Sequence, residues 1–343
     1  MVAGIAYTIR PSFVTPYLTA RVEEVEPYLF LRKFDVPFWA LARISEHPAT
    51  YWYRLEQHLG SFSLVGTTIS RPEVLPEHVL ADEKHSKILK RKAYIAFTVA
   101  QECVLGAGVS WNADEAGLLE AYRPFQQEAQ KLLPNYTPKT VNVDGWEATE
   151  NTWKILFPTI VCIRCLLHVF IKVRDRFTKK KEKRELFKET ADWFWKRCFQ
   201  ATSKTAFSQN LRRFDEWSKK QDLNESVALA IAKMREKRND YRVAFDFPGA
   251  HRTSNMLDRL MRRLDRRLFS SQFLHGSLAV AQKHVRAWAL IYNFAPSNPQ
   301  TVKRYKGWQS PAERLNQFQY HECWLQNLFI SASLGGFRGP PQN

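Results

Sequence analysis

The chain has 343 residues, 45% hydrophobic and 13% aromatic, which is enough apolar material for a folded core and excludes an intrinsically disordered chain. Its 51 Lys and Arg residues outnumber 34 Asp and Glu residues, and the net charge of +17 favours a polyanionic partner, most often nucleic acid. An anionic membrane surface would also attract this charge, but the sequence shows no clear amphipathic anchor.

The most apolar stretch, residues 155–171, contains Pro158, Arg164 and His168 and is too short and too polar to span a bilayer. The N-terminus lacks the basic start and long apolar core of a signal peptide. The five cysteines have no spacing typical of a disulfide framework. We therefore expect reduced thiols, a cytosolic or nucleoid-associated location and no membrane partner.

Residues 1–70 are expected to form a helical N-terminal region. An apolar face over residues 38–44 is followed by a break at residues 45–48 and a second apolar face over residues 51–59. Two short helices joined by a tight turn form either a helix-turn-helix DNA-binding unit or an ordinary helical hairpin, and the sequence leaves both interpretations open.

Residues 71–172 are expected to form the first part of an α/β core. A short strand ends at Asp82, and β-branched or aromatic runs at residues 94–99 and 103–109 complete a predicted antiparallel meander. Apolar residues at helical intervals then predict a helix over residues 113–132.

A second strand–helix set follows in the same region. A predicted strand over residues 139–143 ends at Asp144, and a strand over residues 159–163 follows a helix over residues 149–156. Connections this short between strands imply parallel pairing with a helical crossover.

Residues 173–250 are predicted to be a helical insertion, and residues 251–295 to be the remainder of the core. A basic helix with an apolar stripe is expected over residues 253–268, and a core helix over residues 277–294. Residues 296–343 are expected to form a connector and a short helix.

Asp82 and Asp144 each close a predicted strand, where a carboxylate is held rigidly at the crevice in which α/β sheets place their sites. If the two strands are neighbours, the carboxylates converge, and divalent cations would relieve their repulsion. Carboxylates with water suit Mg²⁺ or Mn²⁺, and two ions roughly 4 Å apart would contact both reacting oxygens of a phosphodiester. Asp258, on the basic helix, can supply the third acid. Each aspartate also has an ordinary interpretation, as a turn former or, for Asp258, as the i,i+4 partner of Arg262.

Three segments resemble the acidic motifs of bacterial insertion-sequence transposases of the DDE class. They are Ala81-Asp82-Glu83-Lys84-His85, Val143-Asp144-Gly145-Trp146 and Thr253-Ser254-Asn255-Met256-Leu257-Asp258-Arg259. Cys165 and His168, just past a predicted strand, are similar to the Cys-x-x-His element that follows the second acidic motif in several transposase superfamilies. The resemblance covers roughly residues 75–295.

The resemblance implies a ribonuclease-H-like fold, with a mixed sheet flanked by helices and an all-helical insertion. It implies metal-dependent cleavage of DNA at transposon ends and strand transfer into target DNA, with Asp82, Asp144 and Asp258 as the catalytic ligands of two Mg²⁺ or Mn²⁺ ions. Pairing of two ends implies at least a homodimer on DNA, in the bacterial cytoplasm. The alternatives are a catalytically impaired, transposase-derived DNA-binding protein and a ribonuclease-H-like nuclease.

The third acid departs from the family pattern, because Asp258 stands where Glu is usual and its side chain is one methylene shorter. Either its helix sits closer to the ions or the activity is impaired. Asp265, two turns farther along the helix, is the reserve ligand. Glu83 would point to the opposite face of its strand from Asp82.

The Cys-x-x-His element also needs an interpretation. Cys162, Cys165 and His168 lack the fourth ligand of a structural zinc site. We expect Cys165 and His168 instead to fix the turn from strand to helix, with His168 near the DNA or the metal site.

Basic residues near the acidic motifs are candidates for phosphate contact, which provides affinity and register rather than sequence reading. They are Lys179, Lys180, Lys181, Arg259, Arg262 and Arg263. A solvated helix face is the ordinary interpretation of the run that contains the three lysines. Trp193 and Trp195 are expected either in the core or stacked on an unpaired base.

Overall fold

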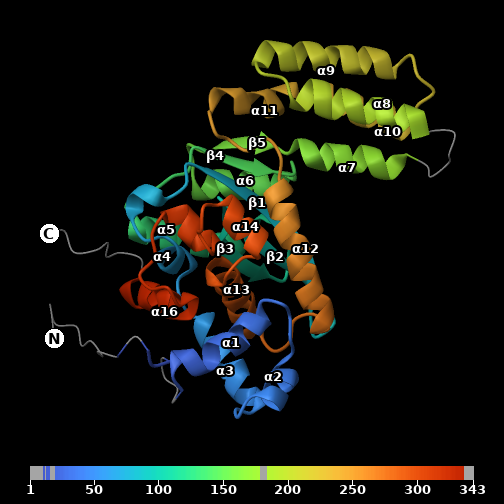
Figure 1. Ribbon diagram of the computed structural model, residues 1–343. Helices are drawn as coiled ribbons and strands as arrows, with labels where there is room; N and C mark the ends of the chain where they lie inside the picture. The colour runs from blue at the N-terminus through green and yellow to red at the C-terminus, as the bar shows by residue number, and fades with distance from the viewer. Residues whose placement is uncertain (1–10, 12, 16–19, 178–183, 336–343) are drawn as a thin grey trace. The chain divides into compact units, whose positions relative to one another are not determined.

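The computed structural model describes residues 11, 13–15, 20–177 and 184–335 (Figure 1). The chain divides into two compact units, of which the first contains Met1–Pro76, Glu83–Tyr136 and Leu260–Asn343, and the second contains Glu77–Asp82 and Thr137–Arg259. Within the described ranges, no helix combines the length and the apolar character needed to cross a membrane.

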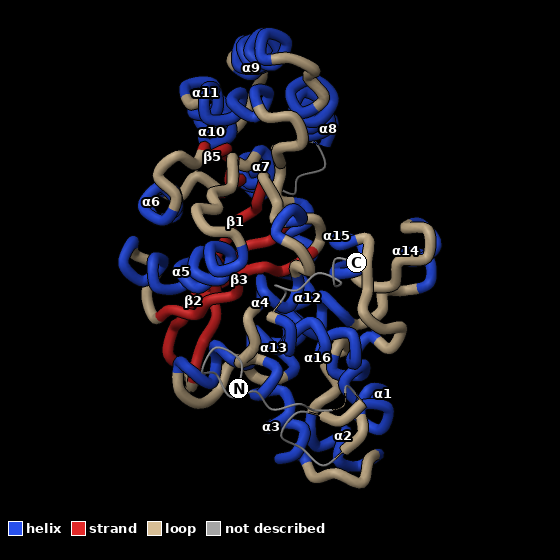
Figure 2. The backbone as a smooth tube through the Cα atoms, turned by 90° about the vertical axis from the view of Figure 1, so that its left-hand side faces the viewer, coloured by secondary structure: helices blue, strands red, loops and turns tan. Residues whose placement is uncertain are grey.

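A five-stranded mixed sheet has the strand order β3-β2-β1-β4-β5 (Figure 2, strands in red). Its strands are β1 (His78–Ile88), β2 (Arg91–Ala100), β3 (Cys103–Ser110), β4 (Thr140–Val143) and β5 (Val161–Arg164). β1 pairs with β4 in parallel and β4 with β5 in parallel, whereas β2 and β3 are antiparallel. This order is that of a ribonuclease-H-like sheet, so the fold class expected from the sequence is confirmed.

The first strand is longer than predicted. The sequence interpretation ended it at Asp82, but β1 continues until the chain reverses at Leu89 and Lys90, whose φ angles are 47° and 69°. Gln101 and Glu102 form a similar turn between β2 and β3, with φ angles of 47° and 68°. Positive φ at both positions is typical of type I′ hairpin turns, which usually contain Asn and Gly. The turn after β1 therefore had no recognisable marker in the sequence.

The first unit holds most of the helices outside the insertion. They are α1 (Val22–Arg32), α2 (Phe38–Ile44), α3 (Ala49–Leu59), α4 (Leu64–Thr68), η1 (Pro72–Val74), α5 (Glu115–Leu132), α13 (Leu278–Phe294), α14 (Pro299–Arg304), α15 (Pro311–Asn316) and α16 (Trp324–Leu334). α2 and α3 are the two short helices predicted near the N-terminus, and DNA reading by them stays a prediction. α12 (Asn255–Ser270) contributes residues to both units.

The open edge of β3 is covered by α13. Gln282 accepts a hydrogen bond from the backbone N of Val109 (2.7 Å) and donates one to the carbonyl of Ala107 (2.5 Å). Asn293 accepts from the N of Val104 (2.9 Å) and donates to its carbonyl (2.8 Å). An uncovered strand edge invites pairing with other chains, so these two amide side chains both anchor α13 and protect the sheet.

A buried ion network connects four helices of the first unit. Glu56 of α3, 1% exposed, lies 2.7 Å from Nε of Arg32, 2.7 Å from Nη2 of Arg267 and 2.8 Å from Nδ1 of His284. Burial alone would raise the pKa of Glu56, but Arg32 and His284 outweigh burial and hold that pKa below its ordinary value. Glu56 therefore stays ionised and balances the buried guanidinium groups.

The second unit contains β4, β5 and a run of helices (Figure 1). The helices are α6 (Glu147–Leu156), α7 (Leu166–Arg176), α8 (Arg184–Asp192), the π-helix η3 (Trp193–Phe199), α9 (Lys204–Ser218), α10 (Glu225–Glu236), α11 (Arg238–Arg242) and η4 (Val243–Asp246). α7, η3, α9, α10 and α11 share a core that includes Phe194, Phe207 and Phe214, against which Trp193 and Trp195 pack. This is the predicted all-helical insertion, and both tryptophans are partly buried against its core.

Replacing Asn293 with Leu should lower the free energy of unfolding, because it leaves the N–H and the carbonyl of buried Val104 without partners. Each unsatisfied group costs about 1–3 kcal/mol. Urea denaturation measures the loss. Gln282→Leu is the matched control on the same helix. It should cost less, because Gln282 is only half-buried and its partners Ala107 and Val109 keep a little exposure, 3% and 5%, whereas Val104 has none. Equal losses in the two variants would contradict this account.

Glu56→Gln should lower the free energy of unfolding by about 3–5 kcal/mol near neutral pH, because it leaves two arginines buried without a counter-charge. The ordinary pKa of Glu56 is 4.5 and the folded-state pKa lies below it. The charge of Glu56 therefore stabilises the fold above pH 4.5, and this contribution is lost as the pH falls through the folded-state pKa.

Urea unfolding over an acidic pH series should thus show the difference between wild type and Glu56→Gln shrinking below pH 4.5. Glu23→Gln, at an exposed position of α1, should change stability by no more than about 0.5 kcal/mol at any pH. A wild-type advantage that persists undiminished into acid would exclude the role given to Glu56.

Candidate metal centre

Two acidic residues lie at the same end of the parallel part of the sheet. Leu80 of β1 pairs with Asn142 of β4, and Asp82 and Asp144 each lie two residues farther along the chain. Parallel strands run in one direction, so both aspartates follow the paired segments at their carboxyl ends. The two strands are neighbours, as the sequence interpretation required.

Asp82, His168 and Asp258 form a group of side chains that we call the Asp82 cluster. Their ligand atoms all lie within 4.8 Å of one another, and all three residues are half-buried. Nε2 of His168 lies 3.5 Å from Oδ2 of Asp82. In the described part of the chain, this is the only such group of His, Cys, Asp and Glu residues. All three members belong to the second unit.

The Cys-x-x-His element positions two members of the cluster. Cys165 precedes α7, and His168 lies in the first turn of that helix. The backbone N of Ser254 donates to Sγ of Cys165 (3.2 Å), and Cys165 in turn donates to Oγ of Ser254 (3.2 Å). Ser254 Oγ donates to Oδ2 of Asp258 (3.3 Å). Cys165 thereby ties the start of α7 to the start of α12, and so sets the positions of His168 and Asp258 together.

The charges of the cluster partly compensate one another. Burial opposes protonation of His168, but Asp82 and Cys165 outweigh burial and raise the pKa of His168 well above its ordinary value. The resulting imidazolium pairs with Asp82 and offsets some of the repulsion between the two carboxylates.

The donor set also fits a divalent cation, because metal binding can displace the proton from the imidazole of His168. Two carboxylates suit Mg²⁺ or Mn²⁺, and an imidazole is a common additional metal ligand. The 3.5 Å between His168 and Asp82 is shorter than twice a metal–ligand bond of about 2.1 Å, so one ion can contact both atoms. Nδ1 of His168 is buried and has no hydrogen-bond partner among the described residues.

Asp144 is not part of the Asp82 cluster. Its Oδ1 accepts a hydrogen bond from the backbone N of Trp146 (2.7 Å), which closes the turn after β4. Gly145, between them, has a φ of 89°, the left-handed conformation that glycine adopts without strain. Of the three predicted ligands, the structure thus brings Asp82 and Asp258 together and adds His168. It places Asp144 just past the end of the neighbouring strand β4, where Asp144 closes a turn.

Two further acidic residues weighed from the sequence, Asp265 and Glu83, have partners outside the cluster. Asp265, the reserve ligand, lies 2.7 Å from Nζ of Lys84 in an ion pair of the first unit. Glu83 accepts a hydrogen bond from the hydroxyl of Tyr122 (2.7 Å). Neither belongs to the Asp82 cluster, which agrees with the sequence interpretation of Glu83.

Cysteine contributes to no metal-ligand group among the described residues. Cys162 is half-buried and donates to the carbonyl of Glu150, while Cys165 is occupied by Ser254. The structural interpretation of the Cys-x-x-His element therefore agrees with the observed contacts better than a zinc site does.

The candidate DNA-contact residues divide into two sets. Arg259, Arg262 and Arg263 are exposed on α12, and the guanidinium of Arg263 lies 5.4 Å from the centre of the Tyr292 ring. Phosphate contact by these arginines stays a prediction. Lys179, Lys180 and Lys181 lie outside the described residues. Another arginine of the same helix, Arg267, is buried against Glu56 and is therefore not exposed for contact with the phosphate backbone of DNA.

Models of known protein families show no match to this chain, and a comparison with curated protein sequences likewise finds none. The fold and the Asp82 cluster are therefore the features that indicate a function.

Mn²⁺ or Mg²⁺ should raise the thermal unfolding midpoint of the wild-type protein, because an ion held by the folded cluster stabilises that state. The gain is about 2.7 kcal/mol at a cation concentration 100 times Kd. Asp258→Asn should lose most of the gain. Asp265→Asn is the matched control on the same helix and should keep it. An equal cation effect in both variants would show that the ion binds elsewhere.

Proposed function

We propose that this protein is a transposase of the DDE class, which cleaves DNA at transposon ends and joins the ends to target DNA in a metal-dependent reaction. The observation that carries the proposal is the Asp82 cluster: two aspartates from the first and third acidic motifs lie in one metal-ligand group on a ribonuclease-H-like sheet. The helical insertion between β5 and α12 supports the same assignment.

The identity of the third acidic residue, Asp258, bears on whether the site is active. Its side chain is shorter than that of the usual Glu, and a shorter side chain could leave the enzyme impaired. Asp258 nevertheless lies within the 4.8 Å group, and Ser254 holds its Oδ2 in place. The start of α12 is therefore close enough to β1 for Asp to serve where Glu is usual, which favours an active enzyme over a DNA-binding derivative.

The residues of the site have separable roles in the proposed reaction. Asp82, His168 and Asp258 would hold a cation. Asp144, which follows the strand next to β1, would complete a second site if its side chain gave up the hydrogen bond to Trp146. Bound cations would supply Lewis acidity at the attacking and leaving oxygens of the scissile phosphate. Arg259, Arg262 and Arg263 would contact the DNA backbone and set its register. Pairing of two transposon ends would require at least a dimer on DNA.

A second candidate is a ribonuclease-H-like nuclease that cuts without joining. The observation that favours it is the hydrogen bond between Asp144 and the backbone of Trp146, which leaves one three-residue metal-ligand group among the described residues. Joining products with terminal-repeat DNA would exclude this candidate.

Asp82→Asn should reduce DNA cleavage by about 10²–10³-fold, the range for removing one preorganised charge-stabilising group. Asp144→Ala should do the same if the reaction uses two ions. Both variants should bind terminal-repeat DNA near normally in a gel-shift assay. Asp265→Asn is the control and should cleave like the wild type. Full cleavage by Asp82→Asn would contradict the assignment of the Asp82 cluster as the catalytic site. Full cleavage by Asp144→Ala would indicate a nuclease that uses one ion.

A further inference from the structure

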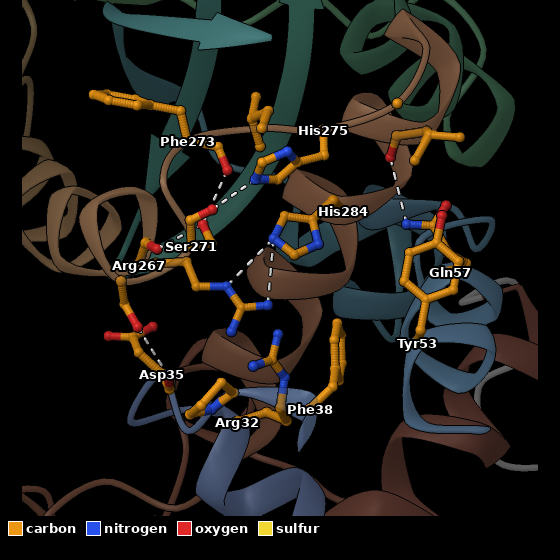
Figure 3. Close-up of a pocket in the computed structure, with 15 residues that line it drawn as sticks. Arg32, Asp35, Phe38, Tyr53, Gln57, Arg267, Ser271, Phe273, His275 and His284 are labelled. Carbon is orange, nitrogen blue, oxygen red and sulfur yellow. Dashed lines mark hydrogen bonds between the residues drawn. The ribbon is translucent and has the colours of Figure 1, made fainter. Parts of the chain in front are cut away.

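The first unit contains a cavity of about 340 Å³ that the proposed function does not use (Figure 3). Ligand pockets span ~300–1,000 Å³, so this cavity suits a ligand with one ring system rather than a long chain. Every residue that lines it belongs to the first unit, from the end of α1 through α3 and from the end of α12 to α13.

Aromatic rings form much of the wall. Phe38 and Tyr53 meet edge to face, with ring centroids 6.1 Å apart. The guanidinium of Arg32 lies 4.0 Å from the centre of the Phe38 ring. Phe273 and Val280 add further apolar surface. Such a wall suits a flat aromatic ligand, because aromatic side chains stack on any π-face.

Two buried arginines present hydrogen-bond donors to the cavity. Arg32 and Arg267 both line it and are 4% and 3% exposed, and Figure 3 shows their guanidinium groups directed toward the same space. Nε of Arg32 donates to Glu56, and Nη1 of Arg32 donates to the carbonyl of Val36. Nε of Arg267 donates to His284, and Nη2 of Arg267 donates to Glu56. Within the described residues, Nη2 of Arg32 and Nη1 of Arg267 have no acceptor.

Asp35 brings a carboxyl group to the lining of the same cavity. Its Oδ1 is buried and has no hydrogen-bond partner among the described residues. Burial raises the pKa of Asp35 to about 6, against the opposing effect of Arg32 and Arg266. At neutral pH the carboxylate is therefore a ready acceptor for an N–H group of a ligand.

This combination excludes the simpler ligand classes. Asp35 would repel a small anion, and the two guanidinium groups would repel a cation. A hydrocarbon would leave all three polar groups buried and unpaired. A planar heteroaromatic ring with acceptors on one edge and donors on another satisfies them all. We propose that the cavity binds one unpaired nucleobase, with guanine as the best match, because O6 and N7 accept from arginine and N2 donates.

The proposal goes beyond the proposed function and does not depend on it, because the cavity and the Asp82 cluster belong to different units. The base has two possible sources, a free nucleotide or an unpaired position in a DNA strand. The chemistry of recognition is the same for both, so the experiment has one arm for each.

In the first arm, isothermal titration calorimetry measures binding of GMP to the full-length protein in EDTA, which excludes any contribution from bound cations. GMP should bind and ribose 5-phosphate, which lacks the base, should not. AMP should bind more weakly, because adenine presents a donor where guanine has O6.

Variants test whether the binding takes place in this cavity. Tyr53→Ala should raise the Kd for GMP at least about 5-fold through lost stacking, and Tyr53 is 41% exposed, so the fold should tolerate the change. Phe38→Ala should act in the same direction. Trp39→Ala is the matched control, because Trp39 follows Phe38 on α2, is 71% exposed and does not line the cavity; it should leave the Kd unchanged.

In the second arm, fluorescence anisotropy compares oligothymidylate that carries one guanine with the same strand carrying an abasic residue at that position. Tighter binding of the guanine strand that is lost in Tyr53→Ala identifies a DNA strand as the source. An effect of Tyr53→Ala on GMP alone identifies a free nucleotide. No guanine-dependent binding in either arm, or binding that Tyr53→Ala leaves unchanged, overturns the proposal without affecting the test of DNA cleavage.

Discussion

The parallel pairing of the first half of β1 with β4 is the constraint on which the candidate metal centre depends. Side chains alternate between the two faces of a strand, so a one-residue slip of this pairing would send Asp82 to the other face. The observed register, with Leu80 opposite Asn142, makes Asp82 and Asp144 neighbours at one end of the parallel strands. The pairing of β4 with β5 then leads the chain to Cys165 and His168 at the same end.

The third acid reaches the site through a contact that involves no ion. Cys165 and Ser254 exchange hydrogen bonds and so hold the start of α12 against the start of α7. A small thiol and a small hydroxyl allow the two segments to approach closely. This close approach explains how Asp258, with its short side chain, joins Asp82 and His168.

Buried charge in the first unit has a different consequence. Glu56 neutralises only part of the guanidinium charge around it, and the geometry of Arg32 and Arg267 leaves one amino group of each directed toward the cavity. An arginine has five N–H donors and rarely satisfies all of them within a core. The network that stabilises the packing of α1, α3, α12 and α13 thus also creates a polar surface inside an otherwise apolar pocket.

The sequence by itself determined the class of the elements and their order, because alternation of apolar residues distinguishes strands from helices locally. It located the second strand–helix set, the helical insertion, the core helix α13 and the aspartates that end or interrupt strands. It missed the extension of β1 past Asp82, since Leu89 and Lys90 form a tight turn without the residues that usually mark one.

Only the tertiary structure decided which side chains share the site. His168 belongs to the Asp82 cluster, whereas Asp144 closes a turn. Arg267 is buried against Glu56, whereas the arginines Arg262, Arg263 and Arg266 of the same helix are exposed. These outcomes depend on side-chain directions and on contacts between segments far apart in the chain. Local periodicity carries no information on either, because the same helical or strand pattern is compatible with many such contacts.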